Sequence, residues 1–262
     1  MAFADVNGTV LHYEYLTEFE DEPVLVLVNS LGTDFRIWLP FIDELTENWS
    51  ILVYDKRGHG LSDVGSAPCS MEDHARDLIG LVNHIGIKSA VFCGVSVGGL
   101  IVQMLYKLKP QLVEKLVLCD TAAKVGTADG WNGRIATVNE KGIKAIADGV
   151  MKVWFTPDFH AGRAADLAGY RNMLVRQSVE GYNATCVALR DADLTADAPK
   201  IRVPTLVVVG DQDGSTPPEL VKATADRIPG AQFQIIKGCG HLPCIEQPER
   251  LAELLSGFVN ED

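Results

Sequence analysis

Residues 94–98 read G-V-S-V-G and place Ser96 between two glycines. The run follows the apolar stretch 90–93 and precedes a helical pattern, so it lies at a predicted strand-to-helix turn. A serine in such a turn has a strained backbone that exposes its hydroxyl, and side chains at the flanking positions would collide with neighbouring chain. The placement of this short motif predicts that Ser96 is a nucleophile.

A serine hydroxyl becomes an effective nucleophile when a histidine takes its proton and an acid holds that histidine in place. His241 follows the last predicted strand, and residues 210–213, which read G-D-Q-D, follow the strand before it. The order serine, aspartate, histidine is the one that this architecture uses. Asp213 is the preferred acid because the acid usually stands three residues beyond the glycine that ends the strand. Asp211 is the alternative, and we interpret it as a turn or capping residue.

Acyl transfer also needs two backbone N–H groups that bind the oxyanion of the tetrahedral intermediate. One candidate is the amide of Val97, which directly follows the nucleophile. The other is the amide of Leu31, in the loop that follows the apolar run 24–28. A leucine in a turn can instead simply cover the core. The turn 55–60 also follows a strand, and we expect its Asp and Arg to brace the loop.

The elements that must position these residues follow from the hydrophobic pattern. Asn7-Gly8 separates two short runs and predicts an antiparallel hairpin. Short continuous apolar runs bounded by turn residues are typical of strands covered on both faces; they lie at 24–28, 51–53, 90–93, 115–119, 205–209 and 233–236. Helical patterns lie between them, at 71–85, 97–108, 217–228 and 248–258. This alternation predicts an α/β fold with a mostly parallel central sheet and helices on both faces.

The alternation breaks between residues 124 and 199, where no buried strand is evident and several short helices with aromatic residues are expected. We therefore predict a core of residues 1–123 and 200–262 and a helical cap of residues 124–199. The cap carries nine basic and nine acidic residues, so the net negative charge belongs to the core. A cap that is neutral in this way would suit an anionic ligand.

The chain of 262 residues is 47% hydrophobic, and its 35 Asp and Glu against 23 Lys and Arg give a net charge of −12. This charge would repel nucleic acid and anionic membrane surfaces, so neither is an expected partner. The apolar runs are shorter than the roughly 18 residues of a membrane span, and the first ten residues do not resemble a signal peptide. We expect a cytoplasmic protein.

Six cysteines and six histidines are scattered without the spacing of metal ligands. Free buried thiols in a reducing compartment explain the cysteines best. The sequence therefore predicts no metal site.

Several motifs together resemble the α/β-hydrolase superfamily over almost the full length of the chain. They are the elbow at 94–98, Y-D-K-R-G-H-G-L-S at 54–62, G-D-Q-D at 210–213 and G-H at 240–241. Within that superfamily the chain looks most like the 3-oxoadipate enol-lactonases, through the runs at 29–34, 98–101, 188–195 and 241–248. One departure is Gly214, where proline often follows the acid, and this change loosens the turn without removing the carboxylate.

The resemblance implies hydrolysis of an enol-lactone, 3-oxoadipate enol-lactone, in the degradation of aromatic compounds. Ser96 would attack the ring carbonyl with His241 as base, the ring would open to an enolate that collapses to a ketone, and water would release the acid. No metal, nucleotide or redox cofactor is required. A general carboxylesterase, a C–C bond hydrolase or a cofactor-free haloperoxidase would carry the same triad, and a non-catalytic ligand receptor is a remote alternative. Ser96 disfavours epoxide hydrolases and dehalogenases, which carry aspartate at the elbow.

An anionic lactone that meets a protein of net charge −12 needs a local cation. Arg134 and Arg190 in the cap are the candidates, because arginine offers a planar fork to a carboxylate. Trp131 and Trp154 are candidates for the apolar wall of the pocket. The alternative is that the arginines are solvated or paired with nearby acids such as Asp191, and that the tryptophans fill the core. Assembly into a homo-oligomer remains open.

Overall fold

One sheet organises the protein, and the carboxyl ends of six parallel strands meet at one of its edges. The computed structural model describes residues 1–17, 22–46, 48–66 and 68–260. Within them the strands form an eight-stranded sheet in the order β1-β2-β4-β3-β5-β6-β7-β8. Strands β4, β3, β5, β6, β7 and β8 run parallel to one another. The loops that follow these strands therefore come together in space.

The chain opens with the predicted hairpin. Strands β1 (Ala2–Val6) and β2 (Thr9–Leu16) pair antiparallel, with Val6 opposite Thr9. The two turn residues, Asn7 and Gly8, have φ of 53° and 72°, which is the left-handed backbone that a two-residue hairpin turn requires. β2 then pairs antiparallel with β4, so the hairpin extends the sheet at one side.

The remaining strands lie where the apolar runs predicted them. They are β3 (Val24–Val28), β4 (Ser50–Tyr54), β5 (Ala90–Val95), β6 (Val113–Cys119), β7 (Thr205–Gly210) and β8 (Gln232–Ile236). Every residue of β4, β5 and β7 is buried. Continuous burial of this kind is expected for parallel strands that are covered by helices on both faces.

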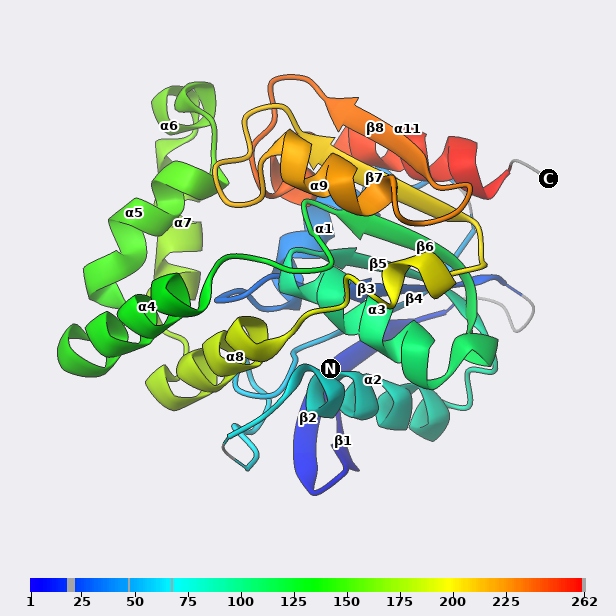
Figure 1. Ribbon diagram of the computed structural model, residues 1–262, viewed down its shortest axis with the longest axis horizontal. Helices are drawn as coiled ribbons and strands as arrows, with labels where there is room; N and C mark the ends of the chain where they lie inside the picture. The colour runs from blue at the N-terminus through cyan, green and yellow to red at the C-terminus, as the bar shows by residue number, and fades with distance from the viewer. Residues whose placement is uncertain (18–21, 47, 67, 261–262) are drawn as a thin grey trace.

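Helices cover both faces of the sheet, as Figure 1 shows. One face carries α2 (Met71–Ile85), α3 (Val97–Leu108) and α9 (Pro218–Ala225), and the other carries α1 (Leu39–Ile42) and α11 (Pro248–Val259). The short helix α10 (Pro243–Glu246) contacts both α1 and α11. Short 3₁₀ turns lie at Phe35–Trp38, Pro110–Leu112 and Ala198–Lys200. The third predicted helix, 217–228, is shorter than expected. It ends at Ala225, with Asp226 as its C-cap.

Five α-helices occupy the segment for which a cap was expected. They are α4 (Ala128–Lys141), α5 (Lys144–Trp154), α6 (Pro157–Gly162), α7 (Ala164–Val175) and α8 (Val179–Asp191). They lie together beside the sheet in Figure 1. Thr127, Thr156 and Ser178 cap α4, α6 and α8 by accepting hydrogen bonds from backbone N–H groups in the first turn.

Close backbone contact attaches α8 to the core. Gly181 packs directly on Gly58, and a Cβ atom on either residue would lie well under 3.0 Å from the backbone of the other. Next to this contact, the backbone N–H of Gly60 donates to Oε1 of Gln177 at 2.9 Å. The start of α8 is therefore fixed against the loop that follows β4.

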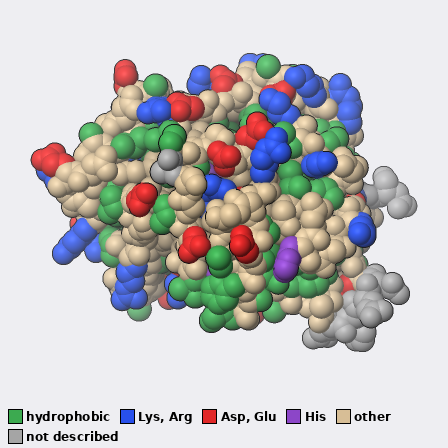
Figure 2. Space-filling model, turned by 90° about the horizontal axis from the view of Figure 1, so that it is seen from below, with side chains coloured by type: hydrophobic (Ala, Val, Ile, Leu, Met, Phe, Trp, Pro, Cys, Tyr) green, Lys and Arg blue, Asp and Glu red, His purple; other side chains and the backbone are tan. Residues whose placement is uncertain are grey.

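All six cysteines are buried free thiols, as the sequence predicted. Cys93 and Cys119 lie on neighbouring strands with their sulfur atoms 3.9 Å apart. No helix within the described residues combines the length and apolar character needed to cross a membrane. Acidic and basic side chains are interspersed on the face of the protein shown in Figure 2.

Two ion pairs on α2 differ sharply in burial. Asp77 is buried and binds Arg57 with both carboxylate oxygens, at 2.5 Å to Nε and 2.6 Å to Nη2. One turn away, Glu72 pairs with Arg76 at the surface. The first pair holds the loop after β4 against the helix, whereas the second is exposed to solvent.

We predict that Asp77→Ala lowers the free energy of unfolding by about 3–5 kcal/mol, because it leaves the guanidinium of Arg57 buried without a partner. Glu72→Ala, the matched control on the same helix, is expected to cost about 0.5 kcal/mol or less. Urea unfolding followed by circular dichroism measures both. Equal losses in the two variants would contradict the role given to the buried pair.

Candidate active site

Ser96 occupies a strained turn between β5 and α3. Its φ and ψ are 59° and −120°, a conformation that costs a non-glycine residue about 1–3 kcal/mol and clusters at functional sites. Its N–H donates to the carbonyl of Cys119 at 2.9 Å, and its own carbonyl accepts from the hydroxyl of Thr121 at 2.6 Å. The neighbouring strand therefore holds this turn in place.

The glycines on either side of Ser96 allow this turn to pack. A Cβ on Gly94 would collide with the backbone of Gly98, and a Cβ on Gly98 would collide with the carbonyl of Val28 at the end of β3. Both contacts would be well under 3.0 Å. The turn thus meets the sequence-based expectation that side chains at these positions have no room, and it brings α3 directly against the end of β3.

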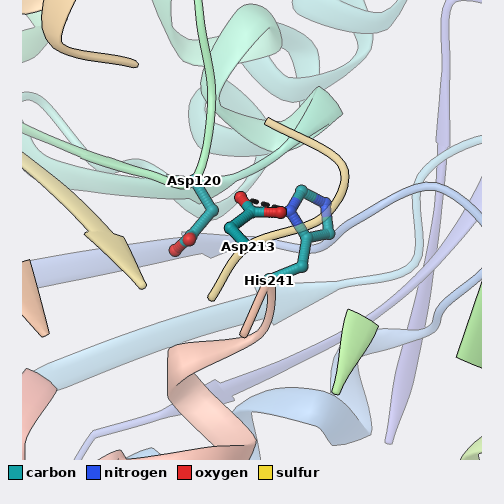
Figure 3. Close-up of side chains that lie close together, drawn as sticks. All are labelled: Asp120, Asp213 and His241. Atoms are coloured by element: carbon teal, nitrogen blue, oxygen red, sulfur yellow. Dashed lines mark hydrogen bonds and ion pairs between the residues drawn. The ribbon is translucent and has the colours of Figure 1, made fainter. Parts of the chain in front are cut away.

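His241 and Asp213 form a buried pair at the same edge of the sheet (Figure 3). Nδ1 of His241 lies 2.9 Å from Oδ2 of Asp213. Asp213 follows β7 and His241 follows β8, so adjacent strands supply the two residues. Ser96, which follows β5, and His241 line the same cavity. The structure thus brings the three predicted triad residues to one site.

The carboxylate of Asp213 accepts several hydrogen bonds besides the one from His241. Backbone N–H groups of Ser215 and Thr216 donate to Oδ1 at 2.7 and 3.0 Å, and the hydroxyl of Thr216 donates to Oδ2 at 2.6 Å. Burial raises the pKa of Asp213, but the charge of His241 and the bonds from His241 and Thr216 outweigh it, so the pKa is lowered. Asp213 is therefore held in its ionised form.

Asp211 has a different setting. Its Oδ1 accepts from the N–H of Cys239 at 3.3 Å, and its Oδ2 lies 3.7 Å from Nζ of Lys237. These contacts join the turn that follows β7 to the turn that follows β8. The structure places Asp213, and not Asp211, against His241.

The loops that carry the acid and the base are locked together and to the cap. A Cβ on Gly210 would collide with the carbonyl of Gly240, so these two loops touch through their backbones. The N–H of His241 donates to the carbonyl of Trp154 at 2.8 Å, and the N–H of Gly214 donates to that of Val153 at 3.3 Å. The end of α5 therefore helps to orient His241.

A second carboxyl group, Asp120, lies beside Asp213 (Figure 3). It directly follows β6, has φ of 47°, and its Oδ1 accepts from the N–H of Gly210 at 2.9 Å. Burial, together with the charge of Asp213, raises the pKa of Asp120 well above the ordinary range. The surroundings of Asp120 therefore favour its protonated form, whereas those of Asp213 favour the ionised form.

Asp120, Asp213 and His241 are also the described residues that come nearest to a metal-ligand set, with one potential ligand atom from each within 4.8 Å of the others. Their chemistry fits a different use. The facing atoms of Asp213 and His241 are already joined by a hydrogen bond, and both oxygens of Asp213 accept further bonds. The surroundings of Asp120 raise its pKa and so oppose the ionised form that a metal ion would need. The arrangement is that of a proton-transfer pair with a second buried carboxyl group beside it.

The two candidate oxyanion donors belong to loops that meet at the cavity. Val97 is the first residue of α3, where the backbone N–H has no partner within the helix and the helix dipole favours an anion. Leu31 follows β3 and lines the cavity together with Ser96 and His241. Gly98 packs on the carbonyl of Val28, so the turn that carries Val97 is fixed against the loop that carries Leu31.

The cavity has a volume of about 270 Å³ and opens between the sheet edge and the cap. Trp131, Arg134 and Trp154, three of the four predicted substrate-binding residues, line it. Trp131 donates from its indole nitrogen to the carbonyl of Val125 at 2.8 Å, and the guanidinium of Arg134 lies 5.2 Å from the centre of its ring. The cap therefore supplies apolar walls and one cation.

The fourth predicted residue, Arg190, is not among the residues that line this cavity. Its guanidinium binds both oxygens of Asp191, at 2.7 and 2.8 Å, and also donates to Oδ1 of Asn132 at 3.0 Å. The adjacent acid satisfies this arginine at the surface. Of the two arginines predicted to bind substrate, Arg134 therefore lines the cavity and Arg190 does not.

Sequence reasoning missed Asp120 and Thr216. Asp120 stands directly after a buried apolar run, the same signal that located Ser96 and Asp213, and could have been found that way. Thr216 follows Asp213 by three residues and donates to it from both its N–H and its hydroxyl; this is a local aspartate-turn pattern that the spacing of the two residues could have indicated.

Comparison with known proteins gives the same fold and family. The model of the alpha/beta hydrolase family matches residues 25–254. A relative named 3-oxoadipate enol-lactonase 2, from Acinetobacter baylyi, is 33% identical over 87% of this chain and 85% of its own. The crystal structure of the enol-lactonase from Burkholderia xenovorans LB400 superposes with a TM-score of 0.96 at 36% identity, covering 99% of this chain and 100% of that one.

A third relative bears another activity in its name. A protein of Stutzerimonas stutzeri named "Putative carbamate hydrolase RutD" is 28% identical over 96% of this chain and 97% of its own. The likeness therefore extends across more than one kind of hydrolase. Because the family model matches most of its length, the chain belongs to the alpha/beta hydrolase family.

Proposed function

We propose that the protein is a serine hydrolase that opens a small anionic enol-lactone, with 3-oxoadipate enol-lactone as the substrate. Ser96 is the nucleophile, His241 the general base and Asp213 the acid that orients it. The amides of Val97 and Leu31 form the oxyanion hole. The enol-lactonases among the relatives support this substrate class.

The proposed reaction has two steps. The Ser96 hydroxyl attacks the ring carbonyl while His241 takes its proton, and the ring C–O bond then breaks as His241 returns that proton to the leaving enol, which becomes a ketone. In the second step His241 takes a proton from water, which attacks the acyl-serine; the bond to Oγ of Ser96 then breaks, His241 returns the proton to Oγ, and the second carboxylic acid is released. Ionised Asp213 stabilises the imidazolium formed in both steps.

The main observation in favour of an anionic substrate is that Arg134 lines the cavity without an acidic partner among the described residues. Among the described residues no carboxylate lies within salt-bridge distance of it, although the cap contains nine acidic residues. Its neighbours are the ring of Trp131 and the hydroxyl of Tyr182. A cation that lines the cavity without an acidic partner is available to a substrate carboxylate.

The size of the cavity also favours a small substrate. A volume of about 270 Å³ is close to the lower end, about 300 Å³, of the range typical of small-molecule pockets. A single lactone ring with a carboxymethyl arm fits this limit better than a long acyl chain. A general carboxylesterase and a carbamate hydrolase remain the alternatives, since both would use the same three residues.

A turnover screen tests the proposed substrate class. Purified protein is assayed with enol-lactones, p-nitrophenyl esters, carbamates and epoxides, and kcat/KM is compared. We expect the anionic enol-lactone to be preferred over neutral esters of similar size by tenfold or more. A higher kcat/KM on carbamates or neutral esters would replace the proposed substrate with that class.

Asp213→Asn is predicted to lower kcat by about 10³–10⁴-fold, because the amide stabilises the wrong tautomer of His241 and leaves its cationic form unsupported. Asp211→Asn, the matched control two residues away, is expected to stay within a fewfold of the wild type. Steady-state assays of both variants provide the measurement. A large loss confined to Asp211→Asn would move the acid to Asp211.

The two arginines of the cap give a second matched pair. Arg134→Met is predicted to lower kcat/KM on the anionic lactone by about ten- to hundredfold, as expected for a charge-assisted hydrogen bond worth about 1.5–3 kcal/mol. The same variant should change kcat/KM on a neutral ester little, and Arg190→Met should change neither. An equal effect of Arg134→Met on both substrates would show that this arginine does not select the anion.

A further inference from the structure

The peptide unit between Ser30 and Leu31 connects the proposed oxyanion hole to the interior of the protein. Its N–H, that of Leu31, is the proposed second donor, and its carbonyl oxygen is that of Ser30. Three groups donate to this oxygen: Nζ of Lys56 at 2.5 Å, the hydroxyl of Thr33 at 2.9 Å and the N–H of Thr33 at 3.4 Å. One of these donors belongs to a side chain that can carry a full charge.

Lys56 is a buried lysine with carbonyl partners. Its side chain is among the largest that are fully buried, at 1% exposure, and its second contact is the carbonyl of Thr33 at 3.5 Å. Among the described residues, none of the carboxylates forms a salt bridge with it. A buried ammonium without a paired carboxylate is costly, so its position under a single loop calls for a reason other than stability.

The nearby charged groups are engaged elsewhere. Asp55 accepts from Phe35 and Leu61 and pairs with His12, and Asp34 binds Arg36. Both raise the pKa of Lys56, but burial is the larger effect and lowers it to about 7. The charge of Lys56 also acts on two buried histidines, His59 and His74. Burial is the main cause that lowers the pKa of each, and the charge of Lys56 is the second, so both histidines are neutral.

His59 fixes the same loop through a neutral contact. Its Nε2 accepts from the N–H of Gly32 at 3.0 Å, and its Nδ1 lies 3.2 Å from the carbonyl of Arg57. Gly32 has φ of 76°, so the loop turns sharply directly after Leu31. His59 thus holds the geometry of the loop, while Lys56 contributes the charge.

A cation at a peptide oxygen changes the N–H at the other end of that peptide. It draws electron density toward the oxygen, which makes the N–H a stronger donor, and hydrogen bonds in such a chain reinforce one another in a low-dielectric interior. The cation also attracts any negative charge that the N–H binds. Both effects grow as charge develops on the oxyanion, so they favour the transition state over the bound substrate.

We propose that Lys56 is a positioning residue that strengthens the oxyanion hole from behind, by donating from a charged ammonium to the carbonyl of Ser30 and thereby polarising the N–H of Leu31. The proposal rests on the proposed function, because it assumes that the amide of Leu31 binds the oxyanion. It assigns a purpose to a buried cation that binds the backbone behind the cavity wall, at the carbonyl of Ser30, and forms no salt bridge with a carboxylate among the described residues.

The test compares Lys56→Met with Thr33→Val. Both remove one donor from the carbonyl of Ser30, but only the first removes a charge. Two probes are used: kcat/KM with p-nitrophenyl acetate, and the inhibition constant of an aryl boronic acid that forms a tetrahedral adduct with the serine. Lys56→Met is expected to lose about ten- to hundredfold in both, and Thr33→Val about threefold or less.

Thermal stability separates this role from that of a simple brace. In Lys56→Met the carbonyl of Ser30 keeps both donors from Thr33, and the carbonyl of Thr33 keeps the side-chain amide of Asn29 at 2.5 Å. No buried acceptor is left empty, and a buried charge is removed. The melting temperature of Lys56→Met is therefore expected to equal or exceed that of the wild type, while its activity falls.

The pH profile gives a readout that a structural role would not change. Lys56 is charged below its pKa of about 7 and neutral above it, so its contribution is present at low pH and lost as the pH rises. The ratio of wild-type to Lys56→Met kcat/KM removes the pH dependence that both proteins share. We expect this ratio to be largest below pH 7 and to approach one toward pH 9, and the ratio of wild type to Thr33→Val to stay constant.

Three results would overturn the proposal: boronate affinity unchanged in Lys56→Met, equal losses in Lys56→Met and Thr33→Val, or a wild-type to Lys56→Met ratio independent of pH. Ser96→Ala, assayed in parallel, tests the assumption beneath it. If Ser96→Ala binds the boronate as the wild type does, the proposed active site fails, whatever Lys56 does. If Ser96→Ala loses binding and Lys56→Met does not, the proposal for Lys56 alone fails.

Discussion

The close packing of Gly98 against the end of β3 is the contact on which the site depends. It is possible only without a side chain at position 98, because a Cβ there would collide with the carbonyl of Val28. This contact fixes the start of α3, and with it the strained backbone of Ser96, against the loop that carries Leu31. One backbone contact thus sets the spacing between the proposed nucleophile and both proposed oxyanion donors.

The ionisable groups around this contact differ in their surroundings. The charge of His241 and the hydrogen bonds from His241 and Thr216 lower the pKa of Asp213, whereas burial raises that of Asp120 beside it. Arg134 lines the cavity without an acidic partner among the described residues, and Lys56 lies behind the loop against carbonyl oxygens. Such fixed charges need no reorganisation during a reaction, which is the principal advantage of a preorganised site.

The sequence was sufficient for features that depend on local pattern. Continuous apolar runs located the buried strands, and the elbow at Ser96 followed from glycine spacing at a strand end. The adjacent Asp191 was also visible in the sequence as a partner for Arg190, whereas the freedom of Arg134 depends on how α4 faces the cavity. The setting of Asp120 and the contact of Lys56 with Ser30 join residues distant in the chain, and no local pattern specifies such contacts.

The central claim is that Ser96 forms a covalent acyl-enzyme. Its most direct test is rapid acid quenching of the wild-type protein during turnover of p-nitrophenyl acetate, followed by peptide mapping with mass spectrometry. The predicted result is one acetyl group on the peptide that contains Ser96, absent when Ser96 is replaced by alanine. Turnover without that adduct, or an acetyl group on a different residue that the reaction requires, would contradict the claim.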